Sequence, residues 1–302
     1  MLALPDHENP HDPDLQRPRL TRAAAPLTCE VEVLDEFGVR RPMHIPAERA
    51  LTLYVDKREI VTLMTLGAAP ELLALGYLRN QQLVGSVEQI ESVTVDWDVS
   101  AAAVATREGA ADFEARTARR IVTTGCGQGT MFGSLMEQID NVRLPPPAAA
   151  RIRQSTLQRL NEAMRKVDSI HRRAGSVHGC ALFRGTEMLT FVEDVGRHNA
   201  IDTIAGWMWM HGGSPLAIGG DKVFYTTGRL TSEMVTKAAQ LGVPIVISRN
   251  GVTQMGYELA RKLGMTLFGR ASQRHFICYC GFERFDAEPE PERAPVRVVS
   301  HG

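Results

Sequence analysis

The stretch of this 302-residue chain with the most ionisable groups is residues 193–202, which read Glu-Asp-Val-Gly-Arg-His-Asn-Ala-Ile-Asp. Residues 187–192 before it suit a β-strand, and apolar residues recur after it at the spacing of an amphipathic helix. The charges therefore lie at a strand-to-helix junction. The free backbone N–H groups and the dipole of a helix start favour an anion such as phosphate, and Arg197 and His198 add positive charge.

The same ten residues also fit a purely structural role. In that interpretation Asp194 caps the helix and Gly196 permits the turn. Arg197 then pairs with Glu193 or Asp202 on a solvated face of the helix. The two interpretations predict different surroundings for Arg197: an anion site in the first case, and an acidic side chain in the second.

A second candidate is Cys126, in the sequence Gly-Cys-Gly-Gln-Gly at residues 125–129. Three glycines in five positions allow unusual backbone angles and leave the thiol uncrowded. A reactive cysteine needs this access, and it needs a thiol pKa that neighbouring N–H groups or a helix start can lower. A small buried cysteine beside a tight turn has the same pattern. Because Gly129 stands at the Cys-x-x-Cys distance, a dithiol pair at this loop is excluded.

Further polar groups lie at the ends of other predicted strands. His178 and Cys180 alternate on one strand and share a face, where they fit two ligands, a His-activated thiol or two buried structural groups. Arg229 follows the strand 223–226 and opens a helix, and residues 270–275 form a basic polar loop between two strands. If the strand order brings Arg197, Arg229 and this loop to one edge, that edge suits a phosphate-rich cofactor such as a guanine nucleotide. No Gly-x-Gly-x-x-Gly or Walker-type sequence is present.

The composition limits the classes of function. With 34 basic and 35 acidic residues the net charge is −1, so no overall field favours nucleic acid or an anionic membrane. No run approaches the roughly 18 apolar residues of a membrane span. The odd number of cysteines, five, suits free thiols in a reducing cytoplasm better than a disulfide framework.

Patterns of apolar residues divide the chain into four parts. Residues 1–27 are rich in proline and charge and are predicted to be a disordered arm. Residues 28–118 contain two hairpins, a helix that starts near Pro70 and further β-strands, and they predict a small α+β domain. Residues 119–286 predict an α/β domain, and residues 287–302 a disordered tail.

The α/β domain is expected to start with a long helix over residues 148–171. The elements that follow have the order β-β-α-β-α-β-α-β, which favours a three-layer α/β sandwich with a mixed sheet. Its first two strands form an antiparallel hairpin, and the later βαβ units are parallel.

In combination, these motifs resemble the formate dehydrogenase accessory sulfurtransferases, the FdhD family. The resemblance runs from about residue 28 to 285 and rests on residues 193–198 with Asp202, on Cys126, on His178, on Gly228-Arg229 with residues 233–235, and on residues 73–76. It implies a cytidine deaminase-like fold for the larger domain. It also implies a cytoplasmic sulfur carrier that takes sulfur from a cysteine desulfurase as a persulfide and passes it to a molybdenum (or tungsten) bis(molybdopterin guanine dinucleotide) cofactor for formate dehydrogenase.

The resemblance assigns roles to individual residues. Cys126 matches the persulfide-bearing cysteine, and the protein is implied to need no metal of its own and to form a homodimer. The residues implied to bind the cofactor are Arg270, Ala271, Ser272, Gln273, Arg274, His275, His178, Asp194, Arg197, His198 and Arg229.

The chain departs from the family pattern at Gly129, where many members have a second cysteine, at residues 80–82, and at His275, where arginine is frequent. Two other functions are considered. A zinc-dependent deaminase needs His-x-Glu and Pro-Cys-x-x-Cys, and neither is present. A cofactor chaperone without sulfur chemistry needs only the binding residues. A structural zinc site of Cys180, Cys278, Cys280 and a histidine is a further possibility.

Overall fold

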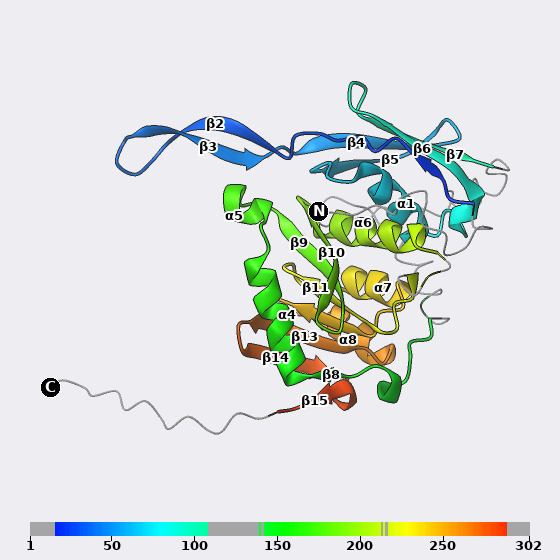
Figure 1. The fold of residues 1–302 in the computed structure, drawn as a ribbon, viewed down its shortest axis with the longest axis vertical. Coiled ribbons are helices and arrows are strands. Elements are labelled where there is room, and N and C mark those ends of the chain that lie inside the picture. Colours follow the sequence, from blue (N-terminus) through cyan, green and yellow to red (C-terminus); the bar gives the residue numbers. More distant parts are fainter. Residues whose placement is uncertain (1–15, 108–138, 140–141, 213, 215–216, 289–302) are drawn as a thin grey trace.

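Alternating apolar and polar residues build a five-stranded N-terminal sheet with one buried face (Figure 1). The structure is a computed structural model, and it describes residues 16–107, 139, 142–212, 214 and 217–288. On β4 the buried residues are Leu51, Leu53 and Val55, and their face of the sheet packs against helix α1 (Pro70–Asn80). The strand order is β1 (Arg19–Leu20), β6 (Ile90–Asp96), β7 (Ala101–Thr106), β4 (Arg49–Val55) and β5 (Arg58–Thr65).

The expectation that residues 1–27 are entirely disordered is wrong for the part that the structure describes. Arg19 and Leu20 pair in parallel with β6 as an edge strand. Thr21 and the backbone of Ala23 donate hydrogen bonds to the Glu71 carboxylate at the start of α1. The polar composition hid this strand because edge pairing uses backbone groups and needs few apolar side chains.

The first predicted hairpin is present as β2 (Thr28–Leu34) and β3 (Arg40–Pro46), which form an antiparallel ribbon of their own. The ribbon projects away from the rest of the molecule (Figure 1). Its partners near the base are residues of the short helix α5 (Ile170–Ala174).

The larger domain contains the predicted mixed sheet of six strands. The hairpin β9–β10 is antiparallel, while β11, β12 and β13 are parallel to one another, as expected. Strand β14 returns antiparallel to β13 at the far edge. The order across the sheet is β10 (Glu187–Asp194), β9 (His178–Arg184), β11 (Lys222–Thr226), β12 (Ile245–Ser248), β13 (Thr266–Ser272) and β14 (His275–Cys280).

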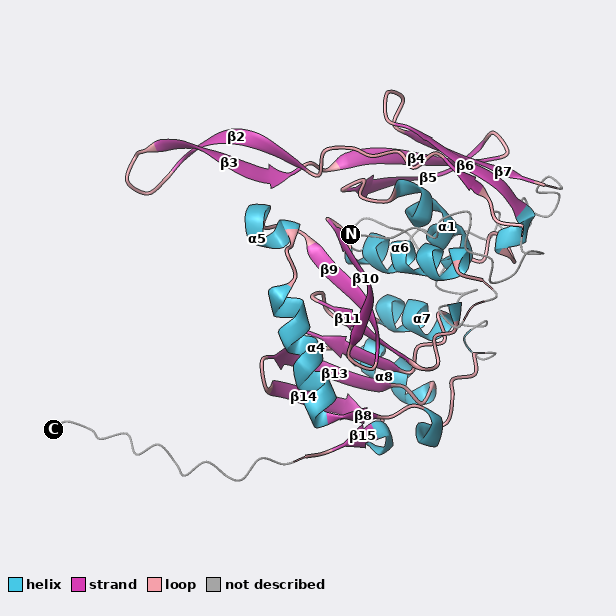
Figure 2. Cartoon of the chain, viewed as in Figure 1, coloured by secondary structure: helices cyan, strands magenta, loops and turns pink. Residues whose placement is uncertain are grey.

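Helices cover the two faces of this sheet unequally (Figure 2). One face packs against α4 (Gln154–Lys166) through a cluster that includes Leu157, Phe183 and Tyr225. The other face packs against α6 (Arg197–Met210), α7 (Ser232–Gln240) and α8 (Gln254–Lys262). A short two-stranded sheet of β8 (Ile152–Arg153) and β15 (Phe285–Asp286) joins the two ends of the domain.

The long helix expected over residues 148–171 is wrong. A 3₁₀ turn (Pro147–Ala149) and β8 take up its first part, and α4 ends at Lys166. A new helix, α5, then begins after Ser169, whose side chain accepts a hydrogen bond from the backbone N–H of Arg172. Serine in this capping position stabilises a helix start, which explains the break in an otherwise helical pattern.

Helices α1 and α6 join the two domains at very close range. An added Cβ on Gly76 would lie 1.6 Å from the carbonyl oxygen of Asp202, and one on Gly206 would lie 2.0 Å from that of Leu72. Only glycine fits at either position, so the two backbones lie in direct contact. As a result α6 is buried on every side, and all of its residues except Trp209 are buried, which corrects the amphipathic helix expected here.

Candidate functional site

The strand order brings the predicted basic turns to one edge of the central sheet. Asp194, the last residue of β10, is paired with His178, the first residue of β9. Thr226 at the end of β11 pairs with Cys180 on one side and Ser248 at the end of β12 on the other. Because β13 runs parallel to β12, its end lies at the same edge. The condition for convergence of Arg197, Arg229 and the residue 270–275 turn is therefore met.

Arg197, His178 and Gly228 come together at the first turn of α6. An added Cβ on Gly228 would lie 2.7 Å from Cδ of Arg197 and 3.5 Å from Nδ1 of His178. The missing side chain at Gly228 thus gives the Arg197 side chain its space. We call Arg197, His178, Gly228 and the neighbouring Arg229 the Arg197 cluster.

Arg197 is buried, with 8% of its surface exposed, yet its guanidinium has no carboxylate partner in the described part of the chain. Its buried Nε atom donates to no acceptor there. Glu193 instead accepts hydrogen bonds from the backbone N–H groups of Ile170 and His171, and Asp202 is paired with Lys237. The purely structural interpretation, in which Arg197 pairs with Glu193 or Asp202 on a solvated face, is wrong. A buried cation without a partner favours an anionic ligand.

The start of α6 is a second feature that favours an anion. Its N-cap residue is Gly196, and no side chain caps the helix. Asp194 was the expected cap, but its carboxylate accepts from the N–H of Gly196 itself and not from the first turn. A 14-residue helix that starts without a side-chain cap in the described residues, with Arg197 in its first turn, is suited to bind a phosphate group.

His178 is half-buried beside Arg197. Burial lowers the pKa of its imidazole, and the positive charges of Arg197, His171 and Arg229 lower it further. The ring is therefore neutral at neutral pH in the protein without a ligand. Its nitrogens make no hydrogen bond within the residues that the structure covers.

Asp194 connects the site to the N-terminal domain. Its carboxylate accepts hydrogen bonds from the Thr65 hydroxyl (2.5 Å) and from the backbone N–H of Leu66 (3.0 Å). It also accepts from the Gly196 backbone and the Asn199 side chain. Burial raises the pKa of Asp194, although these hydrogen bonds oppose the shift. Asp194 was predicted to line the cofactor site. In the structure its carboxylate already accepts hydrogen bonds from four groups of the protein.

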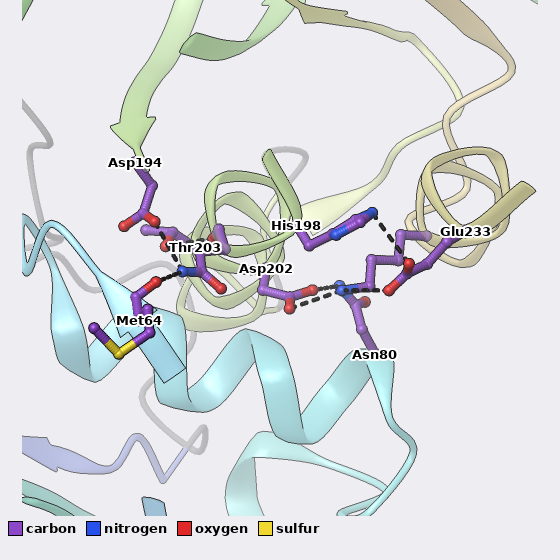
Figure 3. Close-up of polar contacts among 9 residues, drawn as sticks. Met64, Asn80, Asp194, His198, Asp202, Thr203 and Glu233 are labelled. Atoms are coloured by element: carbon purple, nitrogen blue, oxygen red, sulfur yellow. Dashed lines mark hydrogen bonds and ion pairs between the residues drawn. The ribbon is translucent and has the colours of Figure 1, made fainter. Parts of the chain in front are cut away.

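His198 points toward Glu233 of α7, into a polar network between the helices (Figure 3). Its Nε2 lies 3.1 Å from the Glu233 carboxylate, without the alignment of a hydrogen bond. Burial lowers the pKa of His198 to about 2, helped by the charges of Lys237 and Arg197. Lys237 in turn binds Asp202, which also accepts from Asn80 of α1. His198 thus belongs to the contact between domains.

The predicted cofactor loop, residues 270–275, is the tip of the β13–β14 hairpin. Within it Ala271 is buried, whereas Arg270, Ser272, Gln273, Arg274 and His275 are exposed. Arg270 and Gln273 have positive φ angles of 50° and 54°, which non-glycine residues rarely adopt. The backbone N–H of Arg270 donates to Asn250, and Asn161 of α4 donates to the carbonyl of Gln273. The tip is therefore held in a strained shape, which is common at binding sites.

Arg249 is a residue of this edge that the sequence analysis missed. It is exposed directly after β12, between the turn that carries Arg229 and the β13–β14 tip. Asn250 next to it donates to the carbonyl of Thr227, which fixes the two turns to each other. The sequence Ser-Arg-Asn has no signature of its own, but its place at the end of a predicted parallel strand was a usable signal.

The structure tests the predicted roles of Cys180, but not that of Cys126. Cys126 and Gly129 lie outside the described residues, and Cys126 stays a prediction. Burial raises the pKa of Cys180 to about 12, so it is not an activated thiol. Its strand, β9, is four positions from β14, which carries Cys278 and Cys280, a separation of about 19 Å at the usual strand spacing. Cys180 therefore cannot share a zinc ion with them.

The described residues contain no group of three or more His, Cys, Asp or Glu side chains placed to hold a metal ion. None of the helices in the same ranges is long and apolar enough to span a membrane.

Known proteins resemble this chain over most of its length. A sulfur carrier protein FdhD from Bacillus pumilus (strain SAFR-032) is 29% identical over 260 residues, which cover 85% of this chain and 92% of the relative. Another, from Halalkalibacterium halodurans, is 28% identical over 241 residues, 79% of this chain and 87% of the relative.

A solved structure has a similar fold. The crystal structure of a protein described as a formate dehydrogenase accessory protein, from Desulfotalea psychrophila, aligns with a TM-score of 0.66. It is 24% identical, and the alignment covers 86% of this chain and all of that one. The sequence profile of the FdhD/NarQ family matches residues 46–286, from the end of β3 to the end of β15, and this range includes Arg197, Arg229, Arg249 and Arg270. The chain is a member of the FdhD/NarQ family.

Proposed function

We propose that this chain is a sulfur carrier that accepts sulfur from a cysteine desulfurase as a persulfide on Cys126. It transfers this sulfur to a molybdenum bis(molybdopterin guanine dinucleotide) cofactor, bound as substrate, which formate dehydrogenase then receives. Membership in the FdhD/NarQ family and the names of the FdhD relatives support this role. The glycines around Cys126 support its use as the exposed thiol.

The observation that carries the proposal is the buried Arg197, which has no carboxylate partner among the described residues and lies at an edge with further arginines. Arg229 and Arg249 follow β11 and β12, and Arg270 lies near the end of β13. At the usual strand spacing, β9 and β13 are about 14 Å apart. An edge of this length suits a ligand with several separated anionic groups better than a single phosphate. A cofactor with two pyrophosphates has this chemistry.

The transfer of sulfur from the desulfurase to Cys126 needs one nucleophile and no net redox change. The Cys126 thiolate attacks the outer sulfur of the desulfurase persulfide, a bond forms between these two sulfurs, and the desulfurase cysteine leaves as a thiolate. Cys126 then carries the persulfide. In the delivery step the outer sulfur would pass to the substrate cofactor, whose reduced metal centre would supply the two electrons that convert this sulfur to a sulfido ligand, and Cys126 would leave as a thiolate. The Arg197 cluster and the other edge arginines hold the cofactor by its phosphates.

Intact-mass spectrometry after incubation with a cysteine desulfurase and cysteine tests the carrier role. We expect the wild-type protein to gain one sulfur, about 32 Da, as a persulfide. Cys126→Ala should not gain it, whereas Cys29→Ala, which removes the exposed cysteine on the β2 strand, should behave as wild type. A sulfur that persists in Cys126→Ala, or no gain in any of the three proteins, contradicts the carrier role.

The Arg197 cluster also serves a second candidate, a chaperone that binds and delivers the cofactor without carrying sulfur. Gly129, which leaves the cysteine loop with a single thiol, favours this alternative. It predicts normal cofactor binding and normal delivery to formate dehydrogenase by Cys126→Ala. The carrier predicts binding without activation of the dehydrogenase. The homodimer implied by the family is also part of the proposal, and the molar mass in solution tests it.

A further inference from the structure

The His178 ring is surrounded by positive charge and by carboxylates that are already hydrogen-bonded. Helix α6 contributes Arg197 and the neutral His198, helix α5 contributes His171, and the turn after β11 contributes Arg229. The two acids at the end of β10, Glu193 and Asp194, point elsewhere. Glu193 accepts from the first N–H groups of α5, and Asp194 accepts from four donors that include Thr65.

This arrangement leaves His178 as the one group of the Arg197 cluster whose charge can change near neutral pH, because both arginines stay protonated. Without a ligand, an additional charge on His178 would be opposed by Arg197, Arg229 and His171 and by partial burial. An anion held between the arginines reverses the sign of the local field. A protonated ring could then donate a charge-assisted hydrogen bond to a phosphate oxygen.

We propose that the Arg197 cluster binds its phosphate-bearing ligand together with one proton, which the His178 ring takes up from solvent. The inference rests on the proposed function, since it assumes that the cofactor's pyrophosphate binds at this edge. The proton converts neutral imidazole to imidazolium, and no other bond changes. An opposite charge within about 4–6 Å raises the pKa of such a group by about 1–3 units, enough to protonate it near neutral pH.

The affinity for the ligand therefore rises as the pH falls. In the free protein His178 is neutral because its pKa is lowered, and in the complex it is charged, so binding consumes protons between the two pKa values. In this range the dissociation constant decreases by up to about tenfold per pH unit. The site would then hold its cargo most tightly on the acidic side of neutrality and release it as the pH rises.

Calorimetry with a dinucleoside diphosphate, diguanosine 5′,5′-diphosphate, tests the inference. Its bridging pyrophosphate carries no proton that titrates near neutrality, so any proton change belongs to the protein. Titration at about pH 7 in two buffers with different ionisation enthalpies gives the number of protons bound. We expect an uptake approaching one proton in the wild type and in the control His171→Gln. His178→Gln and His178→Asn should still bind, more weakly and without uptake.

The outcomes separate this inference from the proposed function. Two results overturn the inference but leave the proposed cofactor site unchanged. In the first, the wild type binds the ligand without proton uptake. In the second, proton uptake persists in folded His178→Gln and His178→Asn. If the wild type does not bind diguanosine diphosphate, both the proposed phosphate-binding site and this inference are wrong. Far-ultraviolet circular dichroism shows whether each variant is folded. If only one of the two His178 variants folds, its proton uptake decides the matter.

Discussion

Lys237 on α7 lies 2.8 Å from the Asp202 carboxylate on α6, and both side chains are closed off from water. Asn80 on α1 donates to the other oxygen of the same carboxylate. One acidic group therefore joins a helix of the N-terminal domain to two helices of the α/β domain. Loss of a single partner leaves a buried charge without compensation, which is costly.

We predict that Lys237→Met lowers the free energy of unfolding by about 3–5 kcal/mol, because Asp202 remains buried and unpaired. Urea denaturation followed by circular dichroism measures the change. The control is Lys166→Ala, which breaks the exposed pair with Glu162 and should have no measurable effect. Equal stability of Lys237→Met and the wild type would show that the buried pair contributes nothing.

The contact between α1 and α6 gives a second prediction. In Gly206→Ala the new methyl group would overlap the Leu72 carbonyl oxygen, 2.0 Å away, and must push the helices apart. We expect a loss of about 1–3 kcal/mol or more in the free energy of unfolding. Gly251→Ala is the matched control, since an added Cβ there meets nothing within 4 Å. If both variants unfold at the same urea concentration, the close crossing is incorrect.

Gly228 is predicted to act on ligand binding through Arg197. In Gly228→Ala the methyl group displaces the Arg197 side chain, so binding of diguanosine diphosphate should weaken about 10- to 100-fold, the value of a hydrogen bond between charged groups. Arg197→Met should weaken binding by a similar factor. It should keep or slightly raise stability, because it removes an unpaired buried charge and retains the apolar stem.

A double-mutant cycle tests this relationship. If Gly228 works through Arg197, the double variant binds no more weakly than Arg197→Met alone. Additive losses would mean that Gly228 contacts the ligand by itself. Arg184→Met, at the opposite end of β9, serves as the control for loss of an arginine and should bind as the wild type does.

We predict that His198 makes the free energy of unfolding depend on pH. Burial and the charges of Lys237 and Arg197 keep the ring neutral in the folded protein down to a pKa of about 2. The unfolded chain takes up a proton near pH 6.5, so the free energy of unfolding falls as the pH drops below that value, by up to about 1.4 kcal/mol per pH unit from this residue. His198→Gln should flatten the slope between about pH 6.5 and pH 5.5.

Urea titrations across that pH range measure the slope. The control, His44→Gln on the exposed hairpin, should keep the slope of the wild type. A slope in His198→Gln that equals that of the wild type would mean that His198 is charged in the folded state, paired with Glu233.

Local patterns predicted most of the strands and the placement of the basic turns. Strands β2 to β5 follow from alternation and turn residues, and the convergence at one edge follows once β11, β12 and β13 are parallel. The residues around Arg197 in the sequence were enough to identify it as a candidate site residue. Its lack of an acidic partner in the described residues could not be predicted, because it depends on which groups Glu193 and Asp202 contact.

The remaining features depend on contacts between residues far apart in sequence. The apolar spacing of α6 indicates one buried stripe, but Asn199 and Asp202 are buried too because Met64, Asn80 and Lys237 satisfy their polar groups. No local pattern reveals such partners. The break between α4 and α5 depends on a single capping serine, and the edge strand β1 pairs through its backbone.

The backbone contact at Gly76 and Gly206 also limits how this chain can be recombined with a relative. Each glycine is fitted to a carbonyl group on the opposite helix, so a larger residue on one helix requires a matching retreat of the other. The N-terminal domain therefore cannot be exchanged for that of a relative as an independent unit. A chimera that joins it to the α/β domain of a relative has to inherit α1 and α6 from the same parent, and its crossover points belong in the loops outside this pair.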